Sequence, residues 1–230
     1  MQVLFSYLKW GDFMKTGSFL NDISSQLHFY IENHILPQYK DDTSGHGITH
    51  ITYVIRRSLI FAESISNVNK DMVYTIAAYH DLGHSIDPKY HEILSAQLFL
   101  EDMNMKEFFT NAERQTIAEA IEDHRASLQG DPRSIYGKII STADRSTSVF
   151  EFLYRTHLYS LKHEPHLTYD AHMERAYQHM CDKYGKNGYA KSYFKDVEYE
   201  KFQASIQNLI EHKNQFEILY QNINKRPTKK

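Results

Sequence analysis

The stretch Ile76-Ala77-Ala78-Tyr79-His80-Asp81-Leu82-Gly83-His84 decides the fold expected for this chain. It begins as the last turns of an apolar helical stripe, and the same stripe extended by one turn reaches His80. Leu82-Gly83 then ends the helix, so we expect the Asp81 carboxylate to face the same cavity as His80. Imidazole and carboxylate together suit Mn, Fe, Co, Ni or Zn. The stretch therefore predicts a metal site at the end of a buried helix.

Other ligand candidates lie before and after this stretch. His50 precedes it by about one helix, and His91 and His124 follow it on later helices. Asp144 lies four residues after Ile140 in a further helical pattern and is expected to point inward. Burying imidazoles beside two aspartates is costly unless a cation neutralises the carboxylates. The residues expected on this ground to bind a divalent ion are His50, His80, Asp81 and Asp144.

The rest of the chain predicts an all-α, single-domain helical bundle. Among 230 residues, 41% are hydrophobic and 24% charged, with only 9 Gly and 5 Pro, which is typical of a helical globule. A capping-box pattern at Thr110 and Glu113 predicts the start of one helix. Near the C-terminus we expect a helix over 169–184 and one long amphipathic helix over 197–219.

The domain is expected to span 19–224. The stretch 1–18 is expected to be an extension, because Met14 is an equally good translation start, and 225–230 a disordered basic tail. The tyrosine- and histidine-rich segment 154–169 predicts a solvated loop or short-helix lid near the mouth of the site. The C-terminal helix packs either on its own domain or on a second copy, so a homodimer stays open.

Composition also argues against several classes of protein. A net charge of −3 provides no basic field for duplex nucleic acid. The N-terminal apolar run is short and is interrupted by Lys9 and Asp12, so neither a signal peptide nor a membrane span is expected, and the expected location is cytoplasmic. Cys181 is the only cysteine, which argues against disulfides and thiolate metal sites.

The order of His50, the His80-Asp81 doublet and Asp144 resembles the HD phosphohydrolase superfamily, a helical family of metal-dependent phosphohydrolases. The resemblance spans roughly residues 45–145 and includes the segments His91-Glu92-Ile93-Leu94-Ser95-Ala96 and Ile121-Glu122-Asp123-His124. In family members with this fuller set, the doublet's aspartate bridges two ions. The resemblance implies a first ion held by His50, His80, Asp81 and Asp144. The second ion would be held by Asp81, His91 and His124. Alternatively, His91 and His124 bind substrate phosphate beside a single ion.

The resemblance also implies a reaction. Divalent ions held in part by the catalytic Asp81 would activate water for attack on the phosphorus of the substrate. Fe or Mn is favoured, with Mg, Co, Ni or Zn as alternatives. Arg125 and Arg145 each follow a ligand candidate and are expected to offset phosphate charge. His84 is a candidate proton donor to the leaving oxygen, and His46 is expected to contact the ligands from one helical turn before His50.

The expected substrate is a nucleotide or another small phosphoester. Gly188-Tyr189 is followed by Ala190, which argues against the Gly-Tyr-Pro branch of the family that cleaves cyclic dinucleotides. Two other functions stay open. One is an HD-type di-iron oxygenase, and the other is a non-catalytic module that binds a metal ion or a nucleotide.

Overall fold

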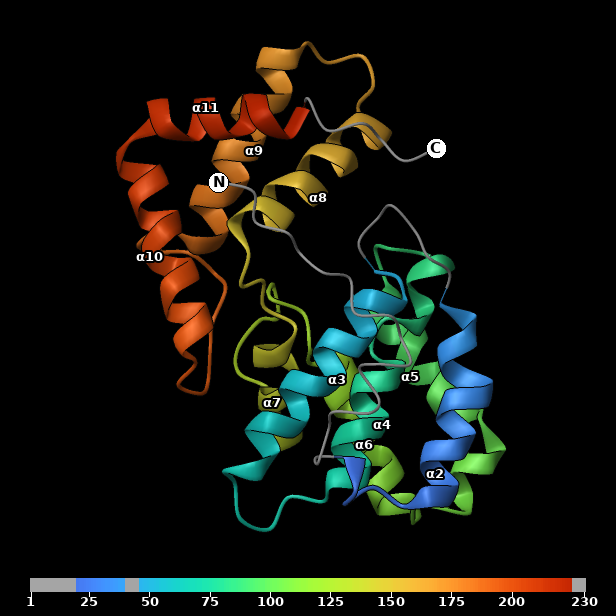
Figure 1. Ribbon diagram of the computed structural model, residues 1–230. Coiled ribbons are helices and arrows are strands. Elements are labelled where there is room, and N and C mark those ends of the chain that lie inside the picture. The colour runs from blue at the N-terminus through green and yellow to red at the C-terminus, as the bar shows by residue number, and fades with distance from the viewer. Residues whose placement is uncertain (1–19, 40–45, 225–230) are drawn as a thin grey trace.

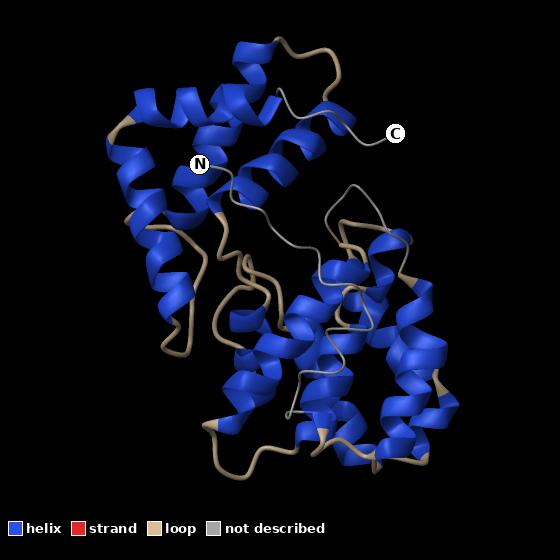
Figure 2. Cartoon of the chain, in the orientation of Figure 1, coloured by secondary structure: helices blue, strands red, loops and turns tan. Residues whose placement is uncertain are grey.

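The computed structural model describes residues 20–39 and 46–224, and this part of the chain is helical and contains no strand (Figure 2). The predicted all-α fold is confirmed. The expected extension 1–18 and basic tail 225–230 lie outside the described residues. No described helix has the length and apolar character needed to cross a membrane. The helices are α2 Ser25–Tyr30, α3 Ile48–Glu63, α4 Lys70–Tyr79, α5 His91–Glu101, α6 Asn111–Glu122, α7 Ile135–Ala143, α8 Val149–His163, α9 Tyr169–Tyr184, α10 Val197–Glu211 and α11 Lys213–Asn224.

Helices α2 to α7 form one group around a shared core (Figure 1). Helix α2 continues as a π-helical turn, Ile31–Ile35, and then a 3₁₀ turn, Leu36–Gln38. Helices α3, α4, α6 and α7 bury their apolar residues, including the stripe predicted before His80. The largest fully buried apolar side chains of this group include Leu27, Ile51, Ile76, Phe99 and Ile117. Burial of such side chains contributes roughly 1.5–3 kcal/mol each, which keeps the ends of these helices in fixed relative positions.

Helices α8 to α11 form a second group with its own core, seen at the top of Figure 1. The predicted loop or lid over 154–169 is wrong, because Ser148 caps α8 and Phe152 and Leu153 bury its inner face. His157 is also buried, and its Nδ1 lies 2.7 Å from the Tyr220 hydroxyl on α11. The aromatic and histidine side chains of this segment thus find their partners inside the second group.

The long helix predicted over 197–219 is two helices. Helix α10 ends at Glu211, and His212 leaves helical geometry with φ −124° and ψ 71°. Helix α11 then begins at Lys213 and packs back against α8, which buries Phe216 and Tyr220. The break at His212 therefore allows the apolar residues on its two sides to enter one core.

The segment between α9 and α10 connects the two groups. Tyr193 N donates to Thr142 Oγ1 at 3.1 Å, and the rings of Phe61 and Phe194 stack with centroids 5.6 Å apart. The first contact lies at the end of α7, two residues before Asp144, and the second lies at the C-terminal end of α3. The single-domain organisation expected for 19–224 stays a prediction.

Candidate metal centre

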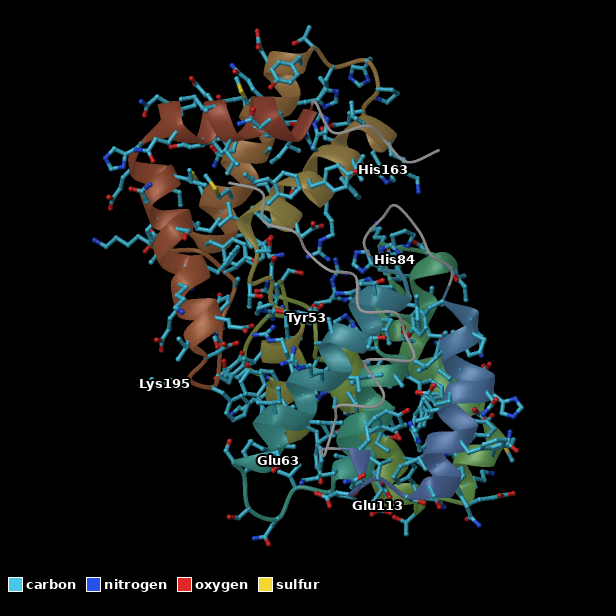
Figure 3. All side chains as sticks on the ribbon, in the orientation of Figure 1. Tyr53, Glu63, His84, Glu113, His163 and Lys195 are labelled. Carbon is cyan, nitrogen blue, oxygen red and sulfur yellow. The ribbon has the colours of Figure 1, made fainter. Side chains whose placement is uncertain are left out.

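The ligand candidates gather where several helices of the first group begin or end. His50 lies in the first turn of α3, and His91 is the first residue of α5. His80 and Asp144 directly follow α4 and α7. His84, labelled in Figure 3, lies at the end of the first group that faces α8. Helix termini therefore bring together side chains that are far apart in the sequence.

One set of ligand atoms surrounds the Oδ2 side of Asp81. His50 Nε2 lies 3.4 Å from Asp81 Oδ2 and 3.2 Å from Asp144 Oδ1. His80 Nε2 lies 3.5 Å from the same Asp81 oxygen. His50, His80 and Asp144 each offer one ligand atom, and these atoms lie within 4.8 Å of one another. This spacing suits coordination of one ion.

A second set surrounds the other oxygen of the same carboxylate. Asp81 Oδ1 lies 3.4 Å from His91 Nε2 and 3.6 Å from His124 Nε2. The two imidazole nitrogens are 3.0 Å apart, and all three side chains are buried. The carboxylate of Asp81 thus faces two different groups of imidazoles.

Backbone carbonyl groups fix the tautomers of three of these histidines. The Nδ1 atoms of His80, His91 and His124 donate to the carbonyl three residues earlier, at 2.9, 2.9 and 2.6 Å. Because a carbonyl oxygen only accepts hydrogen bonds, each Nδ1 carries the proton. In the neutral rings each Nε2 then carries the lone pair, on the side of the ring that faces Asp81. A histidine that ligates a metal through Nε2 is commonly held by such a hydrogen bond from its other nitrogen.

A divalent ion fits this arrangement. His80 is fully buried, and its Nε2 has no hydrogen-bond partner among the described residues. Two lone pairs on His91 and His124, facing each other at 3.0 Å, also need a cation or a proton between them. Buried polar atoms without partners are costly and rare, so these atoms indicate a ligand. Nitrogen and carboxylate donors suit transition metals in particular.

The electrostatics of the cluster keep both carboxylates ionised. Burial raises the pKa of Asp144, but His50 and His80 outweigh it and hold the pKa well below its usual range. Burial lowers the pKa of His80 to about 4. Burial also lowers the pKa of His50, but Asp144 and Asp81 together raise it to about 9. Binding of a metal ion would therefore displace a proton from the cluster.

The predicted arginines lie beside the ligand-bearing segments and are held by protein groups. Arg125 Nη1 donates to Glu92 Oε1 at 2.9 Å and to the carbonyl of Lys89 at 2.8 Å. Arg145 is buried; its Nη2 donates to Ser141 Oγ at 2.5 Å, and its Nη1 lies 3.7 Å from Asp144 Oδ2. Both guanidinium groups thus support the cluster's scaffold, and only Arg145 approaches a ligand carboxylate directly.

Two further histidines, His46 and His84, stack on each other beside the ligand candidates. The rings of His46 and His84 are nearly parallel, with centroids 3.9 Å apart. His46 Nδ1 lies 2.7 Å from Asp81 Oδ2, as its spacing from His50 predicted. His46 and His84 are both only partly buried.

Two positioning side chains escaped the sequence analysis. Arg57 is buried, and its Nη1 donates to the carbonyls of Ala143 and Arg145 at 2.5 and 2.7 Å. Asp123, next to His124, accepts from Arg133 N at 2.7 Å. An available signal for Arg57 was its position two helical turns after His50, inside a buried stripe.

Comparison with known proteins agrees with this geometry. Residues 47–148 match the HD domain family, and all six ligand candidates lie within that segment. No curated protein and no solved structure matches the chain. Residues 47–148 therefore carry an HD domain, the domain of the HD metal-dependent phosphohydrolase superfamily.

Proposed function

We propose that this protein is a binuclear metal-dependent phosphohydrolase that acts on a nucleotide or another small phosphoester. The observation that carries the proposal is the Asp81 carboxylate, whose Oδ2 and Oδ1 face separate imidazole sets. A carboxylate in this position can bridge two ions. Two adjacent ions are a common means of stabilising the attacking and leaving oxygens of a phosphoryl transfer.

The two ions would be held by different residues. The first would use His50, His80, Asp81 and Asp144, and the second would use Asp81, His91 and His124. Divalent ions supply Lewis acidity and positive charge, which produce a nucleophile from water at neutral pH and offset phosphate charge. The nitrogen-rich donor set favours Fe or Mn over Mg, with Co, Ni and Zn as alternatives.

The protein's own residues then orient and protonate the substrate. His84 stacks on His46, which contacts Asp81, and His84 is only partly buried; both facts support a role for its imidazole as proton donor to a leaving oxygen. Arg145 approaches Asp144 and offers positive charge beside the first ligand set. Arg125, paired with Glu92 at the start of α5, supports the position of His91.

Metal content tests the binuclear centre. Protein purified without added metal is analysed by elemental mass spectrometry, and wild type is compared with His91→Ala and His124→Ala. We expect close to two equivalents in wild type, falling towards one in both variants. One equivalent that is unchanged in the variants would mean a mononuclear centre, with His91 and His124 left to bind substrate.

Activity is tested separately on the same preparations. Release of phosphate or nucleoside from a panel of nucleotides is expected for wild type and is expected to be lost in Asp81→Asn. Oxygen uptake without phosphoester cleavage would instead indicate a di-iron oxygenase, a function that a centre rich in histidine also suits. Nucleotide binding without turnover across several metals would indicate a non-catalytic module. The cytoplasmic location and the homodimer stay predictions.

A further inference from the structure

Tyr39 lies before the HD domain, and its hydroxyl reaches the helix end that leads into the His80-Asp81 pair. The hydroxyl donates to the carbonyl of Ala78 at 2.8 Å. Ala78 lies in α4, two residues before His80. The Tyr39 ring is partly buried and packs against the core of the first group. This contact therefore acts on the main chain that carries two of the ligand candidates.

The end of α4 needs such a donor. Carbonyl groups in the last turn of an α-helix lack the partners that the helix interior supplies. The Ile76 carbonyl accepts from His80 N at 3.0 Å, and the Ala77 carbonyl accepts from the His80 ring at 2.9 Å. The next carbonyl, that of Ala78, accepts from Tyr39. Successive carbonyls of the terminal turn are thus held by His80 itself and by a residue from another element.

The chain before Tyr39 departs from a regular α-helix in a way that brings this ring to α4. Helix α2 is followed by the π-helical turn Ile31–Ile35 and the 3₁₀ turn Leu36–Gln38, and the first of these turns contacts α4. Ile35 and Leu36 are buried and anchor both turns in the core. Tyr39 N then donates to the Leu36 carbonyl at 3.1 Å. π-Helical turns are rare, and many of them lie at functional sites. Here the two turns fix where the Tyr39 hydroxyl lies relative to α4.

The hydrogen bond from Tyr39 is costly to lose. Burial and the Asp81 carboxylate hold the pKa of Tyr39 well above its usual range, so the hydroxyl keeps the proton that it donates. Ala78 is fully buried, so without this hydroxyl its carbonyl would lack a partner. A shift of the terminal turn would relieve that cost and would also move the main chain of His80 and Asp81.

We propose that Tyr39 is a positioning residue of the metal centre, whose hydroxyl fixes the terminal turn of α4 and thereby the placement of His80 and Asp81. This inference rests on the metal centre of the proposed function. It gives the segment 20–39, which lies before the HD domain at 47–148, a role in metal binding. Both proposed ions depend on Asp81, so the effect should reach both ligand sets.

Cobalt binding by the full chain tests this role. Metal is removed with a chelator, and Co²⁺ is then added in competition with a chromophoric chelator to wild type, Tyr39→Phe and Tyr79→Phe. Tyr39→Phe removes the hydroxyl and keeps the ring. Tyr79→Phe is the matched control, because the Tyr79 hydroxyl is next to His80 in sequence but donates to Asp102 Oδ2, at 2.6 Å. In this control Asp102 keeps its hydrogen bond from Tyr30, at 2.8 Å.

We expect Tyr39→Phe to weaken the affinity for Co²⁺ about tenfold, the lower end of the effect of changing a group that orients metal ligands. Its visible Co²⁺ absorption bands, which report coordination geometry, should also differ from those of wild type. Tyr79→Phe should match wild type in both measurements, although it also loses a hydrogen bond. Unchanged affinity and bands in Tyr39→Phe would overturn the proposal, as would an equal loss of affinity in the two variants.

These measurements separate the role of Tyr39 from the proposed hydrolase function. If wild type binds Co²⁺ and Tyr39→Phe binds it more weakly, but no phosphoester is cleaved, the hydrolase proposal fails and the role of Tyr39 stands. Phosphoester cleavage together with wild-type Co²⁺ affinity in Tyr39→Phe has the opposite meaning. Absence of Co²⁺ binding by wild type would overturn both proposals.

A thermal unfolding scan of the metal-free variants separates positioning from folding. Tyr79 is the more deeply buried of the two tyrosines and its hydroxyl bonds a carboxylate, so Tyr39→Phe should unfold at no lower temperature than Tyr79→Phe. A much lower unfolding temperature in Tyr39→Phe, together with weakened Co²⁺ binding, would mean that the hydroxyl only supports the fold and would overturn the proposal.

Discussion

Arg57 holds the main chain on both sides of Asp144. Its Nη1 donates to the carbonyl before Asp144 and to the carbonyl after it, at 2.5 and 2.7 Å. Carbonyls at a helix C-terminus lack partners within the helix, and this guanidinium satisfies two of them at the end of α7. Its Nη2 pairs with Asp196, the residue that caps α10. The position of Asp144 therefore depends on a contact with the second helix group.

Arg57→Lys is expected to weaken metal binding about 10- to 100-fold, the usual effect of changing a group that orients a metal ligand. Lysine keeps the charge but cannot bridge two carbonyls and a carboxylate in one plane. The measurement is metal affinity by competition with a chelator. Arg56→Lys, at an exposed neighbouring position, is the control. Unchanged metal affinity in Arg57→Lys would show that Asp144 does not need this support.

The capping box predicted from sequence at Thr110 and Glu113 is present at the start of α6. Thr110 Oγ1 accepts from Glu113 N, and the Glu113 carboxylate accepts from Thr110 N at 2.9 Å. Thr110→Ala should lower the free energy of unfolding by about 1 kcal/mol, as measured by denaturant titration. Because His124 lies at the opposite end of α6, metal content should stay unchanged. Gln115→Ala, on the exposed surface of the same helix, is expected to have a smaller effect on stability.

Local patterns account for the features that the sequence predicted well. Apolar periodicity predicted the helices that end at His80 and at Asp144, which are α4 and α7. The helix over 149–163 was missed because its tyrosines and histidines predicted a solvated lid, and their distant partners are not visible in the sequence. His157, for example, pairs with Tyr220, which is 63 residues away. Arg57 was missed for the same reason, since the carbonyls it binds are 86 and 88 residues away.

Gly83, predicted to end the helix before it, lies where two segments approach closely. A Cβ atom at this position would lie 2.6 Å from Leu94 Cβ and 2.8 Å from the His91 carbonyl oxygen. Gly83 N also donates to Ser95 Oγ at 2.9 Å. The 3₁₀ turn after Asp81, Leu82–Ser85, therefore packs directly on α5, and this contact sets the separation of Asp81 from His91.

Gly83→Ala should force this turn and α5 apart and lower the free energy of unfolding by roughly 1–3 kcal/mol, because overpacking a dense core strains its neighbours. The second ligand set should suffer most, so metal content should fall towards one equivalent. Ser85→Ala, on the exposed side of the same turn, is the control for both measurements. Full metal content in a folded Gly83→Ala protein would contradict this account of the second set.

Lys183 gives a pH-dependent signature. Burial, Arg145 and Arg155 lower its pKa to about 8, whereas an ordinary lysine titrates near about 10.4. At pH 8 about half of the Lys183 side chains are neutral and nucleophilic, so Lys183 should be acetylated by acetic anhydride many-fold faster than exposed Lys186. Mass-spectrometric mapping of acetylated lysines between pH 6 and 10 measures both rates. Equal rates at pH 8 would contradict the lowered pKa.

The same lowered pKa sets the sign of a stability effect. Because the folded protein holds this proton less tightly than the unfolded chain, the charged side chain destabilises the fold below about pH 8, and the penalty disappears as pH rises towards the unfolded pKa. Lys183→Gln removes the penalty, so its unfolding temperature relative to wild type should be highest below pH 8 and should converge with wild type near pH 10. A constant difference across this range would show that the Lys183 ammonium is solvated in the free protein.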